Sequence, residues 1–222
     1  MIISEKHKYI YLACPKTGTM SIERFLIDQD PSVFRNEIIL NGESIKFAGH
    51  SKIKDIKKKL HNNFEDYQVI GFVRHPYSRM VSSYFFYKNG KPMTKGSLMN
   101  YTGDLSAFMK ASANLFKVYL SRIISFQLWA IVFPYKSNKE FFVDDKKEII
   151  VQHIGLFENL NEDLEQILKR LNLNFDMSKL KKINKSKHEV VSTYFKNRFF
   201  KKLINLKVRK DLRFYKSVEQ RK

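Results

Sequence analysis

Two short apolar runs in this chain end in polar turns and are followed by helical spacing. Residues 9–14 are aromatic and β-branched, as is typical of a buried strand, and Pro15 ends the run because proline has no N–H to donate. Residues 67–73 form a second such run, which ends in Arg74-His75-Pro76. After each run and its turn, apolar residues recur every three or four positions, as they do on one face of a helix. The pattern therefore predicts two strand–turn–helix units.

The rest of the chain alternates between the same kinds of segment. Asn41-Gly42 predicts a hairpin turn before a short strand at 45–48, and Ser51 is expected to cap a helix that ends at Leu60. Residues 89–103 are expected to form a long loop, suited to a lid over an acceptor or an adenine. We further expect a polar lead over residues 1–8, helices over 104–110, 114–126 and about 158–171, and a strand over 147–157.

The turn over residues 15–21, Pro-Lys-Thr-Gly-Thr-Met-Ser, carries the first candidate chemistry. A strand–turn–helix of this kind directs backbone N–H groups and the positive end of a helix dipole at one spot, which binds phosphate. It is not a Walker A loop, because Lys16 precedes the only glycine of the turn. Lys16 would therefore approach an anion from the strand side.

The order P-K-T-G-T resembles the 5′-phosphosulfate loop of sulfotransferases that use 3′-phosphoadenosine-5′-phosphosulfate (PAPS). The phrase F-V-R-H-P-Y-S-R-M-V-S-S-Y resembles the 3′-phosphate motif of the same family, and I-G-L-F-E-N-L resembles a later signature. The resemblance spans roughly residues 9–215. It implies a three-layer, P-loop-like α/β fold with a central, mostly parallel sheet flanked by helices. We expect one such domain over residues 1–222, with a basic helical C-terminal segment from about 179.

The resemblance also implies site residues. Arg74 and Ser82, eight positions apart, would clamp the 3′-phosphate, and an arginine fork suits a pair of phosphate oxygens. Lys16 would act in catalysis by neutralising the oxygen that leaves on the 5′-phosphate. The residues expected to hold the 5′-phosphate are Lys16, Thr17, Gly18, Thr19, Met20 and Ser21.

Two positions depart from the family pattern. Met20 stands where the family loop has a second hydroxyl, which removes one hydrogen-bond donor to the 5′-phosphate. Leu156 stands where the family often has arginine, which removes a charge expected near the nucleotide or the acceptor.

His50 is the candidate general base. It lies between a predicted strand and a predicted helix, where active-site groups of α/β sheets collect, and it resembles the base of a G-H segment in carbohydrate-type sulfotransferases. A neutral imidazole can take the proton of an attacking hydroxyl near neutral pH. The alternative is that its side chain caps the helix that follows. His75 is a poorer candidate because it lies in the Arg-His-Pro turn.

The charge of the chain is strongly basic and uneven. The 222 residues carry 41 Lys and Arg against 22 Asp and Glu, a formal charge of +19. The segment 179–222 alone holds 16 basic and 3 acidic residues. Such a segment suits an acidic glycan or an acidic membrane face, or simply forms a solvated basic surface. No nucleic-acid-binding signature accompanies it, so we expect no nucleic-acid partner.

The sequence also lacks the patterns expected of disulfides, metal sites and membrane segments. The single cysteine, Cys14, cannot form an internal disulfide, and no His/Cys cluster has metal-ligand spacing, so we expect no metal. No signal peptide and no transmembrane segment are expected. The expected location is cytoplasmic, with peripheral contact at an acidic membrane face left open.

The resemblance to these sulfotransferases implies sulfuryl transfer from PAPS to a hydroxyl or amine of an acceptor, with a glycan favoured and 3′-phosphoadenosine-5′-phosphate (PAP) as product. The chemistry is an in-line displacement in which positioning and charge stabilisation dominate. Two alternatives remain open at this point. One is a P-loop-type nucleotide-dependent kinase, and the other is a non-catalytic protein that binds polyanions or nucleic acid.

Overall fold

The computed structural model describes residues 1–90, 105–181 and 188–221. The chain divides into two compact units. The first unit comprises Met1–Pro76, Lys136–Lys185 and Val208–Lys222, and the second comprises Tyr77–Tyr135 and Ser186–Lys207.

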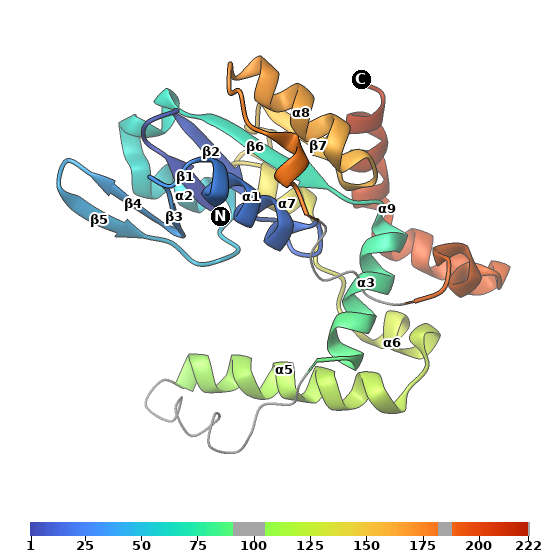
Figure 1. The fold of residues 1–222 in the computed structure, drawn as a ribbon. Helices are drawn as coiled ribbons and strands as arrows, with labels where there is room; N and C mark the ends of the chain where they lie inside the picture. The colour runs from blue at the N-terminus through green and yellow to red at the C-terminus, as the bar shows by residue number, and fades with distance from the viewer. Residues whose placement is uncertain (91–104, 182–187, 222) are drawn as a thin grey trace. The chain divides into compact units, whose positions relative to one another are not determined.

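The first unit is built on a seven-stranded sheet with the order β5-β4-β3-β1-β2-β6-β7 (Figure 1). β2, β6 and β7 pair in parallel, and every other pairing in the sheet is antiparallel. The sheet is therefore mixed, and the prediction of a mostly parallel sheet holds for only three of its strands. The strands are β1 (Ile2–Ser4), β2 (Tyr9–Leu12), β3 (Phe34–Arg35), β4 (Glu37–Leu40), β5 (Glu43–Lys46), β6 (Gln68–Val73) and β7 (His153–Leu156).

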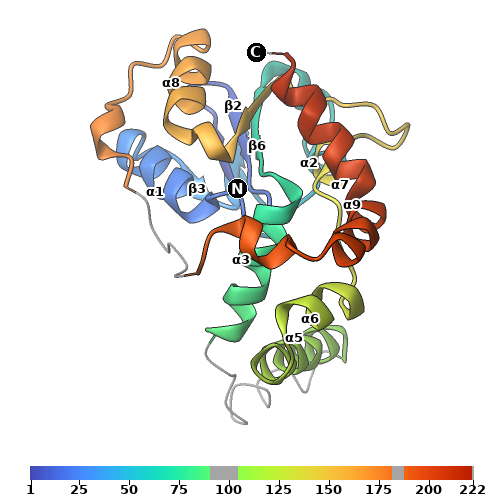
Figure 2. The ribbon, with the colours of Figure 1, turned by 90° about the vertical axis from the view of Figure 1, so that its right-hand side faces the viewer.

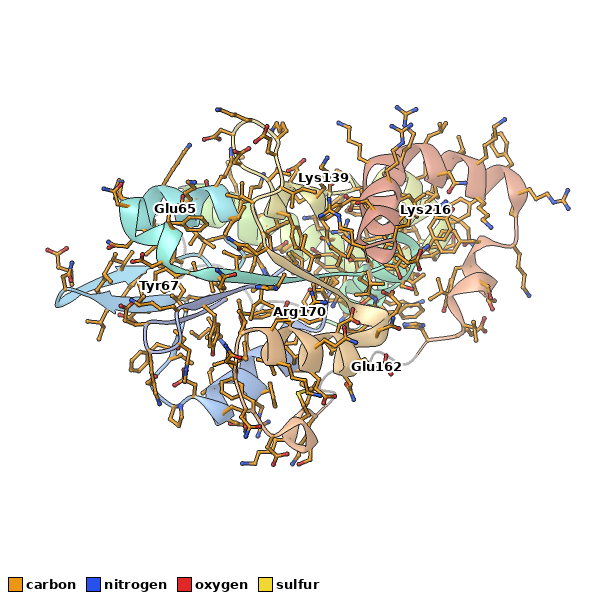
Figure 3. All side chains as sticks on the ribbon, turned by 90° about the horizontal axis from the view of Figure 1, so that it is seen from above. Glu65, Tyr67, Lys139, Glu162, Arg170 and Lys216 are labelled. Carbon is orange, nitrogen blue, oxygen red and sulfur yellow. The ribbon has the colours of Figure 1, made fainter. Side chains whose placement is uncertain are left out.

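Helices cover both faces of this sheet. Figures 2 and 3 show α1 (Thr19–Gln29) and α8 (Leu160–Arg170) on one face, and α2 (Ile53–Leu60), α7 (Lys139–Phe142) and the C-terminal half of α9 (Arg198–Glu219) on the other. This is the three-layer α/β arrangement that was predicted. Short 3₁₀ turns are η1 (His61–Asp66), η2 (Phe157–Asn159), η3 (Met177–Lys179) and η4 (Val191–Phe195).

The core of the first unit lies where the helices meet the sheet. Close approach is possible on the α7 side because Gly71 of β6 has no side chain, and the ring of Phe142 occupies the space above it. Phe142 in turn contacts Phe214 of α9, with ring centroids 5.3 Å apart. On the other face, α1 and α8 bury apolar residues against the strands: Ile22, Phe25 and Leu26 from α1, and Leu160, Leu164, Ile167 and Leu168 from α8.

The second unit is helical and rich in aromatic contacts. It holds most of α3 (Pro76–Lys88), α5 (Leu105–Ile123), α6 (Phe126–Val132) and the first half of α9. Tyr84 of α3 contacts Phe126 and Trp129 of α6 edge-on, and Phe126 also meets Phe195 and Phe200. Stacked and edge-on ring pairs thus form the centre of this unit.

Local signals predicted several elements correctly. The Asn41-Gly42 turn joins β4 and β5, and both of its residues have positive φ (51° and 83°), as a type I′ hairpin turn requires. The helix after Arg74-His75 begins at Pro76, as expected for proline at a first helical position. The first helix also follows its turn, although it begins at Thr19, before Ser21.

Other predictions were wrong. Residues 2–4 form the buried strand β1, whereas a polar lead was expected, because the apolar run Met1–Ile3 is too short to recognise by period. Ser51 does not cap α2, since its hydroxyl donates to Ala48 O and Lys52 takes the N-cap position. The two helices expected over 104–110 and 114–126 are one helix, α5, followed by α6.

The strand expected over 147–157 is also shorter than predicted. It is confined to β7, and Ile149 only bridges Val143. The loop expected over 89–103 lies almost entirely outside the described residues.

A methyl group at Gly71 should destabilise the first unit. The Cβ of an alanine there would lie 2.5 Å from the Phe142 ring, which is fully buried and cannot turn away. We expect Gly71→Ala to lower the free energy of unfolding by about 1–3 kcal/mol, measured by urea denaturation. Gly49→Ala is the matched control, because its Cβ meets only Asn36 at 3.7 Å. Equal effects of the two substitutions would contradict this account.

Candidate functional site

Three parallel strands end at one edge of the sheet, and the predicted motifs follow them. Residues 13–18 follow β2, Arg74 follows β6, and Phe157 and Glu158 follow β7. Leu12 pairs with Gly71, and Val73 pairs with Leu156, so the three carboxyl ends are neighbours. Ligand sites of open α/β sheets occur at this end of the strands. Pairing of the strands therefore brings Lys16 and Arg74 together although 58 residues separate them.

The loop between β2 and α1, called the anion loop here (residues 15–18), has an unusual backbone. Lys16 and Gly18 both have positive φ, 67° and 76°. Gly18 is the N-cap of α1 and has no side chain to cap it, although its carbonyl accepts from Ser21 N at 2.9 Å. The N–H groups of Thr19 and Met20 precede the first hydrogen bond of α1, so they can donate to an anion.

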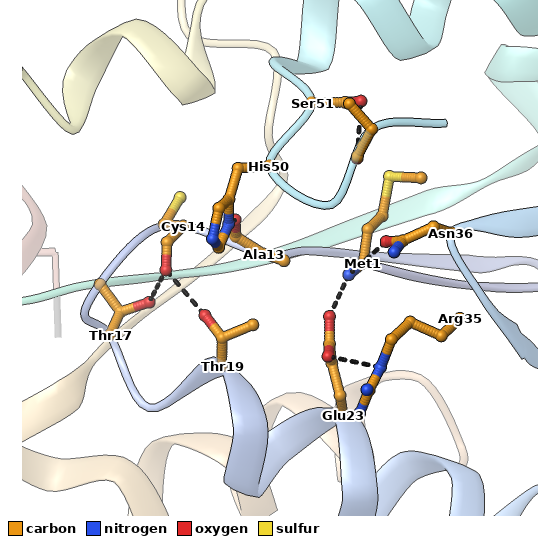
Figure 4. A network of polar contacts seen from close by, with 11 residues as sticks. Met1, Ala13, Cys14, Thr17, Thr19, Glu23, Arg35, Asn36, His50 and Ser51 are labelled. Atoms are coloured by element: carbon orange, nitrogen blue, oxygen red, sulfur yellow. Dashed lines mark hydrogen bonds and ion pairs between the residues drawn. The ribbon is translucent and has the colours of Figure 1, made fainter. Parts of the chain in front are cut away.

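The side chains of Thr17 and Thr19 stabilise the loop from within (Figure 4). Both hydroxyls donate to the carbonyl oxygen of Cys14, at 2.9 Å and 2.7 Å. A hydroxyl has one proton to donate, so in this conformation neither threonine can also donate to a phosphate. Their predicted contribution to phosphate binding would come from the backbone N–H groups.

Arg74 reaches the anion loop from β6. Its guanidinium donates to the backbone oxygen of Lys16 at 3.2 Å and lies over the Phe157 ring, 4.3 Å from its centroid. Its Nε is buried and has no hydrogen-bond partner among the described residues. The site thus contains a buried guanidinium N–H that an added acceptor could satisfy.

Lys16 and Arg74 place two cationic groups in one partly buried region. Burial, with the nearby Arg74 charge as a second cause, lowers the pKa of Lys16 to about 8. Burial also lowers the pKa of Arg74, against the opposing effect of Glu158. Such a region favours an anion, because a negative charge would offset both effects.

His50 is tied to the same loop (Figure 4). Its Nδ1 lies 2.7 Å from Ala13 O, in the turn that leads from β2 into the anion loop. A carbonyl oxygen only accepts, so the contact requires the proton on Nδ1 and leaves the lone pair of the neutral ring on Nε2. The alternative that His50 caps α2 is wrong, because Lys52 is the N-cap and no side chain bonds there.

Glu158 is a residue of this edge to which sequence reasoning assigned no role. One carboxylate oxygen accepts from the backbone N–H of His75 at 3.0 Å, and the other accepts from the Tyr215 hydroxyl at 3.3 Å. Burial lowers the pKa of His75, opposed by Glu158, and raises the pKa of Tyr215. Glu158 thus holds the Arg74-His75 turn in place. The available signal was its position directly after the third parallel strand.

Phe157, which precedes Glu158 in the I-G-L-F-E-N-L signature, was also assigned no role. Its ring lies against Gly18, where an added Cβ would approach to 2.8 Å, and it also carries the Arg74 guanidinium. It therefore packs against both the anion loop and the Arg74 guanidinium.

The remaining expected residues lie in other settings. The Leu156 side chain is buried in the core, so a charge there would not face a nucleotide, and its N–H donates to Asp163 at 2.6 Å. Met20 is the second residue of α1 and is exposed, whereas Ser21 is buried. Ser82 is buried in α3 and belongs to the second unit, so its pairing with Arg74 stays a prediction.

A protein-family model described as the sulfotransferase family matches residues 1–216. The match covers nearly the whole chain, and the chain belongs to this family, whose enzymes transfer a sulfuryl group from PAPS to an acceptor. The kinase and non-catalytic alternatives are therefore dropped. No curated protein and no solved structure matches the chain significantly. Among the described residues, no helix is both long and apolar enough to cross a membrane.

Replacing Lys16 should stabilise the protein in the absence of nucleotide. Its folded-state pKa of about 8 lies below the value of about 10.4 for an unfolded lysine, so between these values the unfolded chain binds more protons. The contribution of Lys16 to the free energy of unfolding therefore rises with pH between about 8 and 10.4. Below pH 8 the full cost of burying its charge is present. Lys16→Met should raise the free energy of unfolding at pH 7 by about 1–2 kcal/mol, allowing for partial exposure, and the gain should shrink towards pH 10.

The measurement is urea unfolding at several pH values. Lys6→Met, at an exposed position, is the control and should have little effect at any pH. A loss of stability in Lys16→Met that does not depend on pH would show that the charge is not disfavoured in the folded state.

Proposed function

We propose that this enzyme sulfates a glycan hydroxyl, with His50 as the general base and Lys16 opposite it at the leaving group. The observation that carries the proposal is the 2.7 Å contact between His50 Nδ1 and Ala13 O. It holds an imidazole with a basic Nε2 beside the loop that also carries Lys16. One loop would thus position both the base and the cation.

The residues at the sheet edge fit the donor. PAPS supplies the sulfuryl group and presents a 5′-phosphosulfate and a 3′-phosphate. The N–H groups at the start of α1 and the Lys16 ammonium suit the first of these anions, and the buried Arg74 Nε offers an unused donor for a second. Lys16 would stabilise negative charge as it develops on the leaving oxygen.

His50 would act on the acceptor side. Its Nε2 accepts the proton of the attacking hydroxyl, while Ala13 O stabilises the Nδ1–H of the imidazolium that forms. Two observations support a glycan as acceptor: the G-H segment resembles that of carbohydrate-type sulfotransferases, and the charge of +19 favours acidic polymers.

If Arg74 and Ser82 clamp the 3′-phosphate, the enzyme should prefer nucleotides that carry this group. Adenosine-3′,5′-bisphosphate should bind at least about tenfold more tightly than 5′-AMP in calorimetry, because one charge-assisted hydrogen bond is worth about 1.5–3 kcal/mol. Ser82→Ala should reduce this preference. Ser83→Ala should leave it unchanged, since the Ser83 hydroxyl donates to Arg79 O one turn earlier. Equal affinity of the wild type for both nucleotides would refute the clamp.

Removing the proposed base should affect turnover and spare donor binding. We expect His50→Ala to lower kcat on a glycan acceptor by about 10²–10⁴-fold, because a positioned general base contributes that much. The affinity for adenosine-3′,5′-bisphosphate should not change, and the acidic limb of the pH–rate profile should disappear. His61→Ala, at an exposed position after α2, is the control.

Full turnover of His50→Ala with an unchanged acidic limb would place the base elsewhere, with His75 next to test. Wild-type transfer to small phenols or amines but not to any glycan would refute the acceptor class and leave the assignment of the base standing.

A further inference from the structure

Exposed apolar side chains are concentrated in the second unit. Among the described residues, fifteen large apolar side chains are well exposed, and twelve of them belong to this unit, although it is the smaller of the two. Single exposed apolar residues need no explanation, but a contiguous group of them marks an interaction surface.

The first half of α9 shows the pattern most clearly. Phe199, Leu203 and Leu206 are spaced as neighbours on one helix face, and they are 72%, 39% and 65% exposed. Phe200 and Ile204, on another side of the helix, are buried. This stretch is therefore apolar towards the core and also towards solvent.

α6 has the same character. Its sequence FQLWAIV contains no charged residue. Three of its residues are buried (Phe126, Trp129 and Ala130), and three others are about half exposed (Leu128, Ile131 and Val132). A seven-residue helix with an apolar buried side and an apolar exposed side is unusual for a surface in contact with water alone.

The two helices are joined by specific contacts. The ammonium group of Lys207 donates to Ala130 O at 2.7 Å and to Ile131 O at 2.8 Å, and it also contacts Phe133 O. The rings of Phe126 and Phe200 meet edge-on, with centroids 6.1 Å apart. The exposed apolar residues therefore belong to helices that are held together.

The charge of the second unit indicates what covers these residues. Its sequence holds 13 Lys and Arg against two Asp and Glu, a net charge of +11. Arg198 and Lys202 are exposed and form the row next to Phe199, Leu203 and Leu206 on α9. Basic residues beside an exposed apolar face are typical of helices that lie in the headgroup region of an anionic membrane.

Other occupants fit less well. A second copy of the chain could use Met109, Phe116 and Ile123, which are exposed at seven-residue spacing along α5. Such a dimer would place two units that each carry a net charge of +11 against one another, and they would repel. A nucleic acid would match the charge and leave the aliphatic faces of α6 and α9 in water.

We infer that the second unit docks on an anionic membrane surface. The docking face consists of the exposed sides of α6 and of the first half of α9, with Arg198 and Lys202 among acidic headgroups. This goes beyond sulfuryl transfer and needs none of the residues proposed for it.

The test is sedimentation of the full chain with vesicles at about 0.1 M salt, where surface charges more than about 10 Å apart are screened. Vesicles of phosphatidylcholine alone are compared with vesicles that also contain phosphatidylserine. The wild type should bind only the second kind. Leu203→Ser/Leu206→Ser should bind at least about tenfold more weakly, because two exposed leucines lose their apolar burial in the membrane.

Charge variants provide the matched comparison. Arg198→Glu/Lys202→Glu should weaken binding by at least about 25-fold, at about fivefold for each basic residue lost. Lys201→Glu lies on the same helix away from the apolar row, and it should have a much smaller effect. Turnover on a soluble acceptor should be the same in all variants, which keeps this test separate from that of the proposed function.

Three outcomes would overturn the inference. The wild type could fail to bind phosphatidylserine vesicles. The double leucine variant could bind as well as the wild type, which would show that the basic residues alone cause vesicle binding and that the apolar residues do not contribute. The wild type could form dimers in solution that the double leucine variant abolishes, which would make the face an interface between copies of the chain.

Discussion

The parallel pairing of β2, β6 and β7 is the constraint on which the candidate site depends. Leu12 opposite Gly71 and Val73 opposite Leu156 fix the heights at which the three strands end. Because β2 stops at Leu12, the next two carbonyl oxygens lie outside the ladder. Ala13 O accepts a hydrogen bond from His50, and Cys14 O accepts hydrogen bonds from Thr17 and Thr19. The end of one strand thus supplies the acceptors that order the anion loop and the proposed base.

The sequence predicted what local residues determine. The anion loop, the Arg74-His75-Pro76 turn and the Asn41-Gly42 hairpin each lie within a few residues, and their proline, glycine and helical spacing identify them. β1 and the roles of Phe157 and Glu158 could not be predicted in the same way, although the I-G-L-F-E-N-L signature contains both residues. Their roles arise from pairing and packing with partners far away in the chain, as when Phe157 fills the space beside Gly18. His50 was found because a family motif marked it, although its contact with Ala13 could not be read from sequence.

The backbone conformation and the buried charges of the site lower the stability of the folded protein. Lys16 has a left-handed backbone conformation, is partly buried, and lies near the buried guanidinium of Arg74. Each of these features disfavours the folded state when no anion is present. Proteins retain such features where binding or catalysis requires them, so this cost is expected of a site that binds an anionic donor.

The threonine contacts to Cys14 bear on how the site assembles during folding. They span only three and five residues, whereas His50 reaches Ala13 across 37 residues and Arg74 reaches Lys16 across 58. Short-range contacts close a smaller loop and lose less chain entropy than long-range contacts. The two threonine contacts are therefore expected to form with a smaller loss of chain entropy than the contacts that bring His50 and Arg74 to the loop.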